Sequence, residues 1–241
     1  GLRTKLVNFS WFENSQSSTE RLDAFDGLAP RDGNTAATLR EAGHDVFPMT
    51  DLAVHQTLRM IRSSGRRSGI LVGDSTQPAV ARALRKLAQH RGWSSTPVLM
   101  PPGQRSGRKA RKIAKRIQVS RLVGAWVLSN RYRGHRDGDP KTLDHLRKLG
   151  EAEGLLTGRF HQVCMALALG TPFLAVGSNT AKIEAICIDA GLDPARRVLG
   201  SEQITCVQGI PCFSEHEQRC LDDWRSGLPS QWGRLCDWVL T

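Results

Sequence analysis

The chain has 241 residues, of which 39% are hydrophobic and 24% are charged, the proportions of an ordinary globular protein rather than a disordered one. Its 34 Lys and Arg against 23 Asp and Glu give a formal net charge of +11, which suits a nucleic acid, an anionic membrane face or a small acidic substrate as partner. No run approaches the ~20 apolar residues that cross a bilayer, and the pattern of a signal peptide is absent.

The N-terminal part contains the pieces of an α/β unit. Residues 5–11 are predicted to form a strand, residues 34–42 a short helix and residues 45–49 a second strand. Residues 62–68 are small, polar and basic, which is typical of a linker. We therefore assign residues 1–62 to a partial N-terminal Rossmann-like domain.

From residue 69 onward, predicted strands and helices alternate. Strands are expected at residues 69–73, 96–100, 122–128, 154–157 and 171–176, and helices after Pro78, at 142–149, from 158 and at 182–190. This alternation predicts a parallel sheet with helices on both faces. We assign residues 69–214 to a C-terminal Rossmann-like domain, with ligands bound at the carboxyl ends of its strands. Residues 215–241 are expected to form terminal helices whose tryptophans pack on this body.

The six cysteines all lie in the last third of the chain, and no two have the CxxC spacing of a zinc site. Cys164 and Cys187 lie within apolar helical patterns. We therefore expect reduced, mostly buried thiols and a cytoplasmic protein. Nothing in the sequence calls for a metal.

One strand-to-helix junction has the residues of an anion site. Apolar residues at 160, 163, 164 and 167 define the buried stripe of the helix, so Arg159 and His161 lie in its first turn and off that stripe. A helix N-terminus attracts anions, an arginine fork binds carboxylate or phosphate, and a histidine can donate a proton. The plainer interpretation is a surface arginine and a histidine that caps the turn.

A second helix start follows at residues 177–180. Ser178 or Asn179 can cap this helix, and Lys182 lies in its first turn. Taken alone, this is an ordinary N-cap. Because consecutive strands of one parallel sheet end at the same edge, we expect both helix starts to open onto one site.

The segment from Gly154 to Leu192 resembles the C-terminal signature of the polysaccharide pyruvyl transferase family. The family typically shows an Arg-Leu-His triplet, a small-residue helix ending in Gly-Thr-Pro, a Ser-containing loop and a Lys-containing helix ending in Gly-Leu. The matching pieces here are Gly158-Arg-Phe-His161, Ala166-Leu-Ala-Leu-Gly-Thr-Pro172, Gly177-Ser-Asn-Thr-Ala-Lys-Ile-Glu184 and Gly191-Leu192. Phe160 replaces the usual leucine of the triplet.

A weaker resemblance extends upstream. Phe9-Ser-Trp11, Pro30-Arg-Asp-Gly-Asn-Thr35 and Asp51-Leu-Ala53 are similar to the family's earlier pattern. The resemblance implies an α/β fold of Rossmann-like parallel-sheet domains in a GT-B-like arrangement. The family's first βα units have no counterpart here, so we expect an incomplete N-terminal domain.

The resemblance also implies a reaction. Members of the family transfer a pyruvyl group from phosphoenolpyruvate to a hydroxyl of a glycan, and here the acceptor would be a glycan or a lipid-linked sugar, with no further cofactor. Arg31 and Arg159 would hold the phosphate and carboxylate of the donor, and His161 would be the acid that acts beside Arg159. The donor site would also include Ser178, Asn179 and Lys182. Without the resemblance, a salt bridge to Asp32 or another neighbour explains Arg31 equally well.

Two other functions stay open. A glycosyltransferase of the same two-domain architecture would use the loops between residues 157 and 184 to hold the diphosphate of a nucleotide sugar. A non-catalytic relative would keep the fold as a binding or structural module.

A basic stretch at residues 104–118 holds seven Lys and Arg, with Ile113 and Ile117 on one helical stripe. A solvated basic helix is the plainest interpretation. A peripheral contact with an anionic membrane is the next, and it suits an enzyme that acts on lipid-linked sugars. Nucleic acid is less favoured, because the stretch lacks the aromatic residues that stack on bases.

Overall fold

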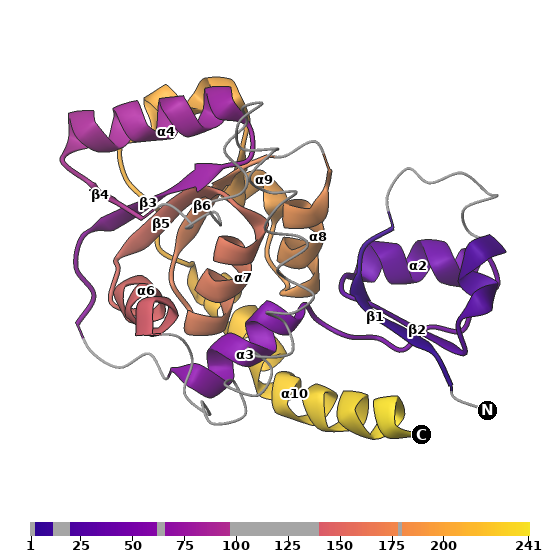
Figure 1. The fold of residues 1–241 in the computed structure, drawn as a ribbon. Helices are drawn as coiled ribbons and strands as arrows, with labels where there is room; N and C mark the ends of the chain where they lie inside the picture. The colour runs from indigo at the N-terminus through magenta and orange to yellow at the C-terminus, as the bar shows by residue number, and fades with distance from the viewer. Residues whose placement is uncertain (1–2, 12–19, 62–65, 97–139, 178–179) are drawn as a thin grey trace, which may run out of the picture.

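The computed structural model describes residues 3–11, 20–61, 66–96, 140–177 and 180–241 (Figure 1). The strands are β1 (Lys5–Phe9), β2 (Gly27–Pro30), β3 (Ile70–Ser75), β4 (Ser94–Ser95), β5 (Gly154–Gly158), β6 (Phe173–Val176) and β7 (Val198–Leu199). The helices are α2 (Gly33–Glu41), α3 (Leu52–Met60), α4 (Pro78–Arg91), α6 (Pro140–Gly150), α7 (Phe160–Leu169), α8 (Lys182–Asp189), α9 (Pro194–Arg197) and α10 (Glu215–Leu240), with 3-10 turns η1 (Glu20–Ala24) and η3 (Ser201–Cys206).

The larger sheet is parallel and has the strand order β4-β3-β5-β6-β7. Its side chains alternate between two apolar layers. Leu71 and Leu155 pack with α3, α6 and α7, whereas Val72 and Leu156 pack with α4 and η3 on the other face. Strands of a parallel sheet are apolar on both sides because helices cover both faces, and Figure 1 shows α4 on one side and α7 on the other. The predicted α/β fold with a parallel sheet is confirmed.

The N-terminal unit is a small parallel sheet of β1 and β2, covered by α2 and η1. Its strand β2 and the helix α3 were not expected from the sequence. The predicted strand at residues 45–49 is wrong, because only Val46 forms a bridge, to Leu28 of β2. Pro48 ends the pairing there, since it has no N–H to donate and restricts the residue before it.

Residues 94–95 form the strand after α4, so the expected strand at 96–100 starts later than the one observed. The rest of that expected strand, the basic stretch at 104–118 and the expected strand at 122–128 lie outside the described residues.

The C-terminal segment is one 26-residue helix, α10, rather than several. Ser214 and Glu217 form a capping box at its start. Trp224 packs against the core of the large sheet, whereas Trp232 and Trp238 pack with Ala29 of the small sheet. The helix therefore runs along both parts of the chain (Figure 1). None of the described helices is both long and apolar enough to cross a membrane.

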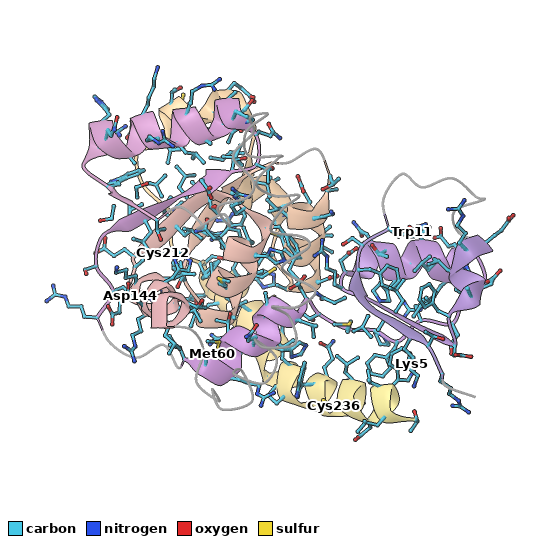
Figure 2. All side chains as sticks on the ribbon, in the orientation of Figure 1. Lys5, Trp11, Met60, Asp144, Cys212 and Cys236 are labelled. Atoms are coloured by element: carbon cyan, nitrogen blue, oxygen red, sulfur yellow. The ribbon has the colours of Figure 1, made fainter. Side chains whose placement is uncertain are left out.

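All six cysteines are free, but only Cys164 and Cys187 are buried, so the expectation of mostly buried thiols was wrong. Burial is the main cause that raises the pKa of Cys164 well above its ordinary value, and it raises the pKa of Cys187 to about 12. Both thiols are therefore protonated at neutral pH. Figure 2 shows how side chains fill the space between the sheets and their helices.

Candidate functional site

The sheet has a switch point between β3 and β5. β3 pairs with β4 on one side and with β5 on the other. The chain leaves β3 through α4 towards β4 but leaves β5 through α7 towards β6, so the two connections run in opposite directions. Ligands of such sheets bind in the crevice at this place. Gly73 and Gly158 let the strand ends come close: a Cβ on Gly73 would lie 2.5 Å from Thr157 Oγ1, and one on Gly158 would lie 2.7 Å from Ser75 Oγ.

A buried hydrogen-bond network fixes the turn from β5 into α7. Thr157 Oγ1 donates to Gln162 Oε1 at 2.5 Å, and Gln162 Nε2 donates to the carbonyl oxygen of Thr96 at 3.0 Å. The backbone N–H of Arg159 donates to Thr157 Oγ1 at 3.1 Å. Because the side chains of Thr157 and Gln162 are fully buried, this network holds the backbone of Arg159 in one position.

Arg159 occupies the N-cap position of α7 and forms a bidentate ion pair with Asp74. Its Nε and Nη2 donate to Asp74 Oδ1 and Oδ2 at 2.9 and 2.8 Å, and the two side chains are 14% and 22% exposed. Such a fork is a strong, oriented contact. Among the described residues, Asp74 is the one whose side chain accepts from the guanidinium of Arg159, through Nε and Nη2.

Arg31 reaches the same place from the N-terminal unit. Its Nε donates to Ser10 Oγ at 2.6 Å and its Nη1 to Asp51 Oδ2 at 3.2 Å. The guanidinium lies over the ring of Phe160, 4.7 Å from the centroid, which is a cation–π contact. The ion pair of Arg31 is thus with the buried Asp51, whereas Asp32 serves as the N-cap of α2.

Phe160 connects the predicted residues. The guanidinium of Arg31 lies over its ring. The exposed ring of His161 contacts the Phe160 ring edge-on, with the two centroids 5.4 Å apart. The structure therefore gathers Arg31, Arg159 and His161 around the first turn of α7. Lys182 begins α8, the helix that follows the neighbouring strand β6.

Ser178 and Asn179 lie outside the described residues, so their expected part in the donor site stays a prediction. The expectation that one of them caps α8 is wrong, because the N-cap of this helix is Ala181. Glu184 of α8 lies close to Gly177: a Cβ on Gly177 would lie 3.6 Å from Glu184 Oε1. Glu184 Oε2 is buried and has no hydrogen-bond partner among the described residues.

Sequence reasoning missed the supporting carboxylates Asp74 and Asp51 and the buried pair Thr157 and Gln162. A signal for Asp74 was present, because Gly-Asp-Ser directly follows the apolar run of β3. Polar residues at the carboxyl end of a parallel strand are typical of a ligand site. The pairing with Arg159 had no local signal, because the two residues are 85 positions apart.

No protein-family model, no curated protein and no solved structure matches this chain. Its chemistry therefore has to be inferred from the residues that meet at the switch point.

Proposed function

We propose that the chain binds phosphoenolpyruvate at the N-terminus of α7 and transfers its pyruvyl group to a hydroxyl of a glycan, as the resemblance to polysaccharide pyruvyl transferases implies. The observation that supports this best is that Arg31, from a distant part of the chain, lies over the ring of Phe160, the residue that directly follows Arg159 at the start of α7. Phosphoenolpyruvate has a phosphate and a carboxylate, and two oriented guanidinium groups suit such a ligand.

The supporting carboxylates fit this role. Asp74 and Asp51 each bind one edge of an arginine, which holds the fork in place and leaves other N–H groups for the donor. Preorganised donors of this kind stabilise charge that develops during a reaction. The backbone N–H groups in the first turn of α7 add positive potential at the same place.

The proposed reaction assigns a role to each residue. His161, which is exposed, protonates the methylene carbon of phosphoenolpyruvate, and a glycan hydroxyl adds to the carbon that bears the phosphate. Phosphate then departs, while Arg31 and Arg159 neutralise it. The first hydroxyl gives its proton back to His161. A second hydroxyl of the glycan then adds to the same carbon and gives its proton to the departing phosphate, which completes the ketal.

The remaining parts of the proposal concern arrangement and partners. Residues 1–62 and 69–214 would be the two Rossmann-like units of a GT-B-like arrangement, with the donor between them. The acceptor would be a glycan or a lipid-linked sugar, and a cytoplasmic enzyme at an anionic membrane surface would meet a lipid-linked acceptor directly.

A non-catalytic relative is the second candidate, and one observation favours it. Both arginines already pair with a carboxylate, Arg31 with Asp51 and Arg159 with Asp74. These pairs cancel much of the positive charge that an active donor site needs. A chain kept only for binding or structure would retain them as links between its elements.

Calorimetric titration of phosphoenolpyruvate into the purified chain separates these candidates. We expect saturable binding, and Arg159→Ala should weaken it about tenfold or more, because a hydrogen bond to a charged group contributes about 1.5–3 kcal/mol. Arg91→Ala is the matched control, since Arg91 is exposed in the last turn of α4. Unchanged affinity in Arg159→Ala would remove this residue from the site.

His161→Ala tests the catalytic role separately. We expect the variant to bind phosphoenolpyruvate with near-normal affinity but to release no phosphate in the presence of a glycan acceptor. A fully active variant would show that another group supplies the proton. A titration with a nucleoside diphosphate is the comparison: binding of that ligand but not of phosphoenolpyruvate would favour the glycosyltransferase.

A further inference from the structure

A cavity of about 370 Å³ lies where α7 ends, at the other end of this helix from Arg159. Its polar lining comes from three separate segments: Arg67 before β3, Cys212 before α10, and Gln218 and Arg225 on α10. Phe213 adds an apolar wall. The volume is within the usual range of small-molecule sites.

The two arginines converge in this cavity. A Cβ built on Gly170 would lie 3.0 Å from Arg225 Nη1 and 3.8 Å from Arg67 Nη2, so both guanidinium groups lie within 4 Å of one point. Arg67 is fixed there, because its Nη2 donates to the carbonyl oxygens of Leu169 and Gly170 at 3.0 and 2.9 Å and its Nη1 donates to the carbonyl oxygen of Ala152 and to Thr171 Oγ1. The carbonyls of Leu169 and Gly170 are end carbonyls of α7, which have no partner within the helix. With both Nη groups engaged, Arg67 acts on a ligand mainly through its positive charge.

In the part of the chain that the structure describes, Arg225 makes fewer hydrogen bonds than Arg67. Its Nη1 has only a long ion pair, 3.4 Å, with the exposed Asp222, and its buried Nε has no hydrogen-bond partner among the described residues. A buried N–H without an acceptor is unfavourable. Burial and then the positive charge of Arg225 lower the pKa of Arg67. The cavity thus holds two guanidinium groups against one carboxylate.

We propose that this cavity binds a small phosphorylated molecule, with its phosphate between Arg67 and Arg225. A dianion suits two guanidinium groups better than a single carboxylate does, because it matches both charges. The phosphate would supply the acceptor that Arg225 Nε lacks, and the rest of the ligand would lie against Phe213. Since α7 has ten residues, about 15 Å of helix separates this site from the one at Arg159.

Cys212 provides a reporter inside the cavity (labelled in Figure 2). Its free, exposed thiol can be alkylated by the anion iodoacetate or by the neutral iodoacetamide. The ratio of the two rates measures the local attraction for anions, because both reagents react with the same thiolate. Cys206 is also free and exposed but does not line the cavity, so it is the reference within the same chain.

The ratio of the iodoacetate rate to the iodoacetamide rate is measured at each cysteine by peptide mass spectrometry. We expect this ratio to be about fivefold higher at Cys212 than at Cys206, because two positive charges lie near Cys212. Inorganic phosphate at millimolar concentration should slow iodoacetate at Cys212 and not at Cys206. Acetate at the same ionic strength should protect much less.

Arg225→Gln should lower the ratio at Cys212 part of the way towards that at Cys206, because the charge of Arg67 remains, and it should abolish the protection by phosphate. Arg219→Gln, an exposed arginine of the same helix, is the matched control and should change neither. Thermal unfolding of each variant verifies that α10 remains folded. Equal ratios at the two cysteines, or protection that persists in Arg225→Gln, would overturn the proposal.

Discussion

The buried ion pair between Arg197 and Glu217 ties α10 to the large sheet, and removing its negative charge should destabilise the whole chain. Arg197 Nε and Nη2 donate to Glu217 Oε1 and Oε2 at 2.9 and 2.8 Å, and the two side chains are 1% and 4% exposed. Arg197 also donates to the carbonyl oxygens of Pro211 and Cys212. Glu217→Gln keeps the shape of the side chain but leaves the guanidinium without its counter-charge.

Two different arguments give a similar loss of folding free energy for Glu217→Gln. Burial alone would raise the pKa of Glu217, but hydrogen bonds from Arg197 and Ser214 and the charge of Arg197 outweigh it and lower the pKa from 4.5 to about 2. That difference corresponds to about 3 kcal/mol at neutral pH. Breaking one side of a buried ion pair costs about 3–5 kcal/mol in other proteins. At about 2–4 °C per kcal/mol for a chain of this size, we expect Tm to fall by roughly 6–20 °C.

Scanning calorimetry at pH 7 measures this effect, with Glu215→Gln as the matched control because Glu215 is exposed in the same first turn. The stabilisation by Glu217 is fully present above its unfolded pKa and is lost as pH falls from about 4.5 towards 2. The difference in Tm between wild type and Glu217→Gln should therefore shrink in acid. A variant that melts within about 1 °C of wild type at pH 7 would refute the reasoning.

Two further substitutions test the packing around the sites. Gly73→Ala would place a Cβ 2.5 Å from Thr157 Oγ1, so we expect the free energy of unfolding, measured in urea, to fall by about 1–3 kcal/mol. Gly209→Ala is the control and should lose little stability, because open space surrounds Gly209. Equal losses in the two variants would contradict this prediction. Burial, and less strongly the charge of Asp32, raise the pKa of Asp189, although Gly33 donates to it. Asp189→Asn should therefore raise Tm at pH 7, with the gain vanishing as pH falls through the pKa of Asp189; a lower Tm at pH 7 would contradict it.

The strands and helices of the large sheet were predictable because their signals are local. β5 and β6 are short apolar runs, and α7 and α8 show the spacing of a buried helical face. Gly170, in the left-handed conformation at φ 64°, ends α7 where the sequence indicated a stop. Burial of apolar side chains and the conformational freedom of glycine act over a few residues, so a single sequence shows them.

The small sheet was less predictable. β2 has only four residues and no alternating pattern. It forms by pairing with β1, and the choice of that partner depends on the fold of the whole unit. Asp51 begins α3 as its N-cap while its other oxygen binds Arg31. That double role depends on where β1 and β2 place Arg31, which no local pattern encodes.

The sequence by itself determined that Arg159 and His161 lie at the start of α7, because the spacing of the buried apolar residues fixes where that helix begins and which side faces the core. Only the tertiary structure decided that Asp74 binds Arg159 and that Arg31 lies over Phe160. Both contacts join residues far apart in the chain. The first forms because the strand order brings the end of β3 beside the start of α7, whereas the second depends on where the separate sheet of β1 and β2 places Arg31. Strand order follows from how the layers pack together, which is a property of the whole fold rather than of any segment.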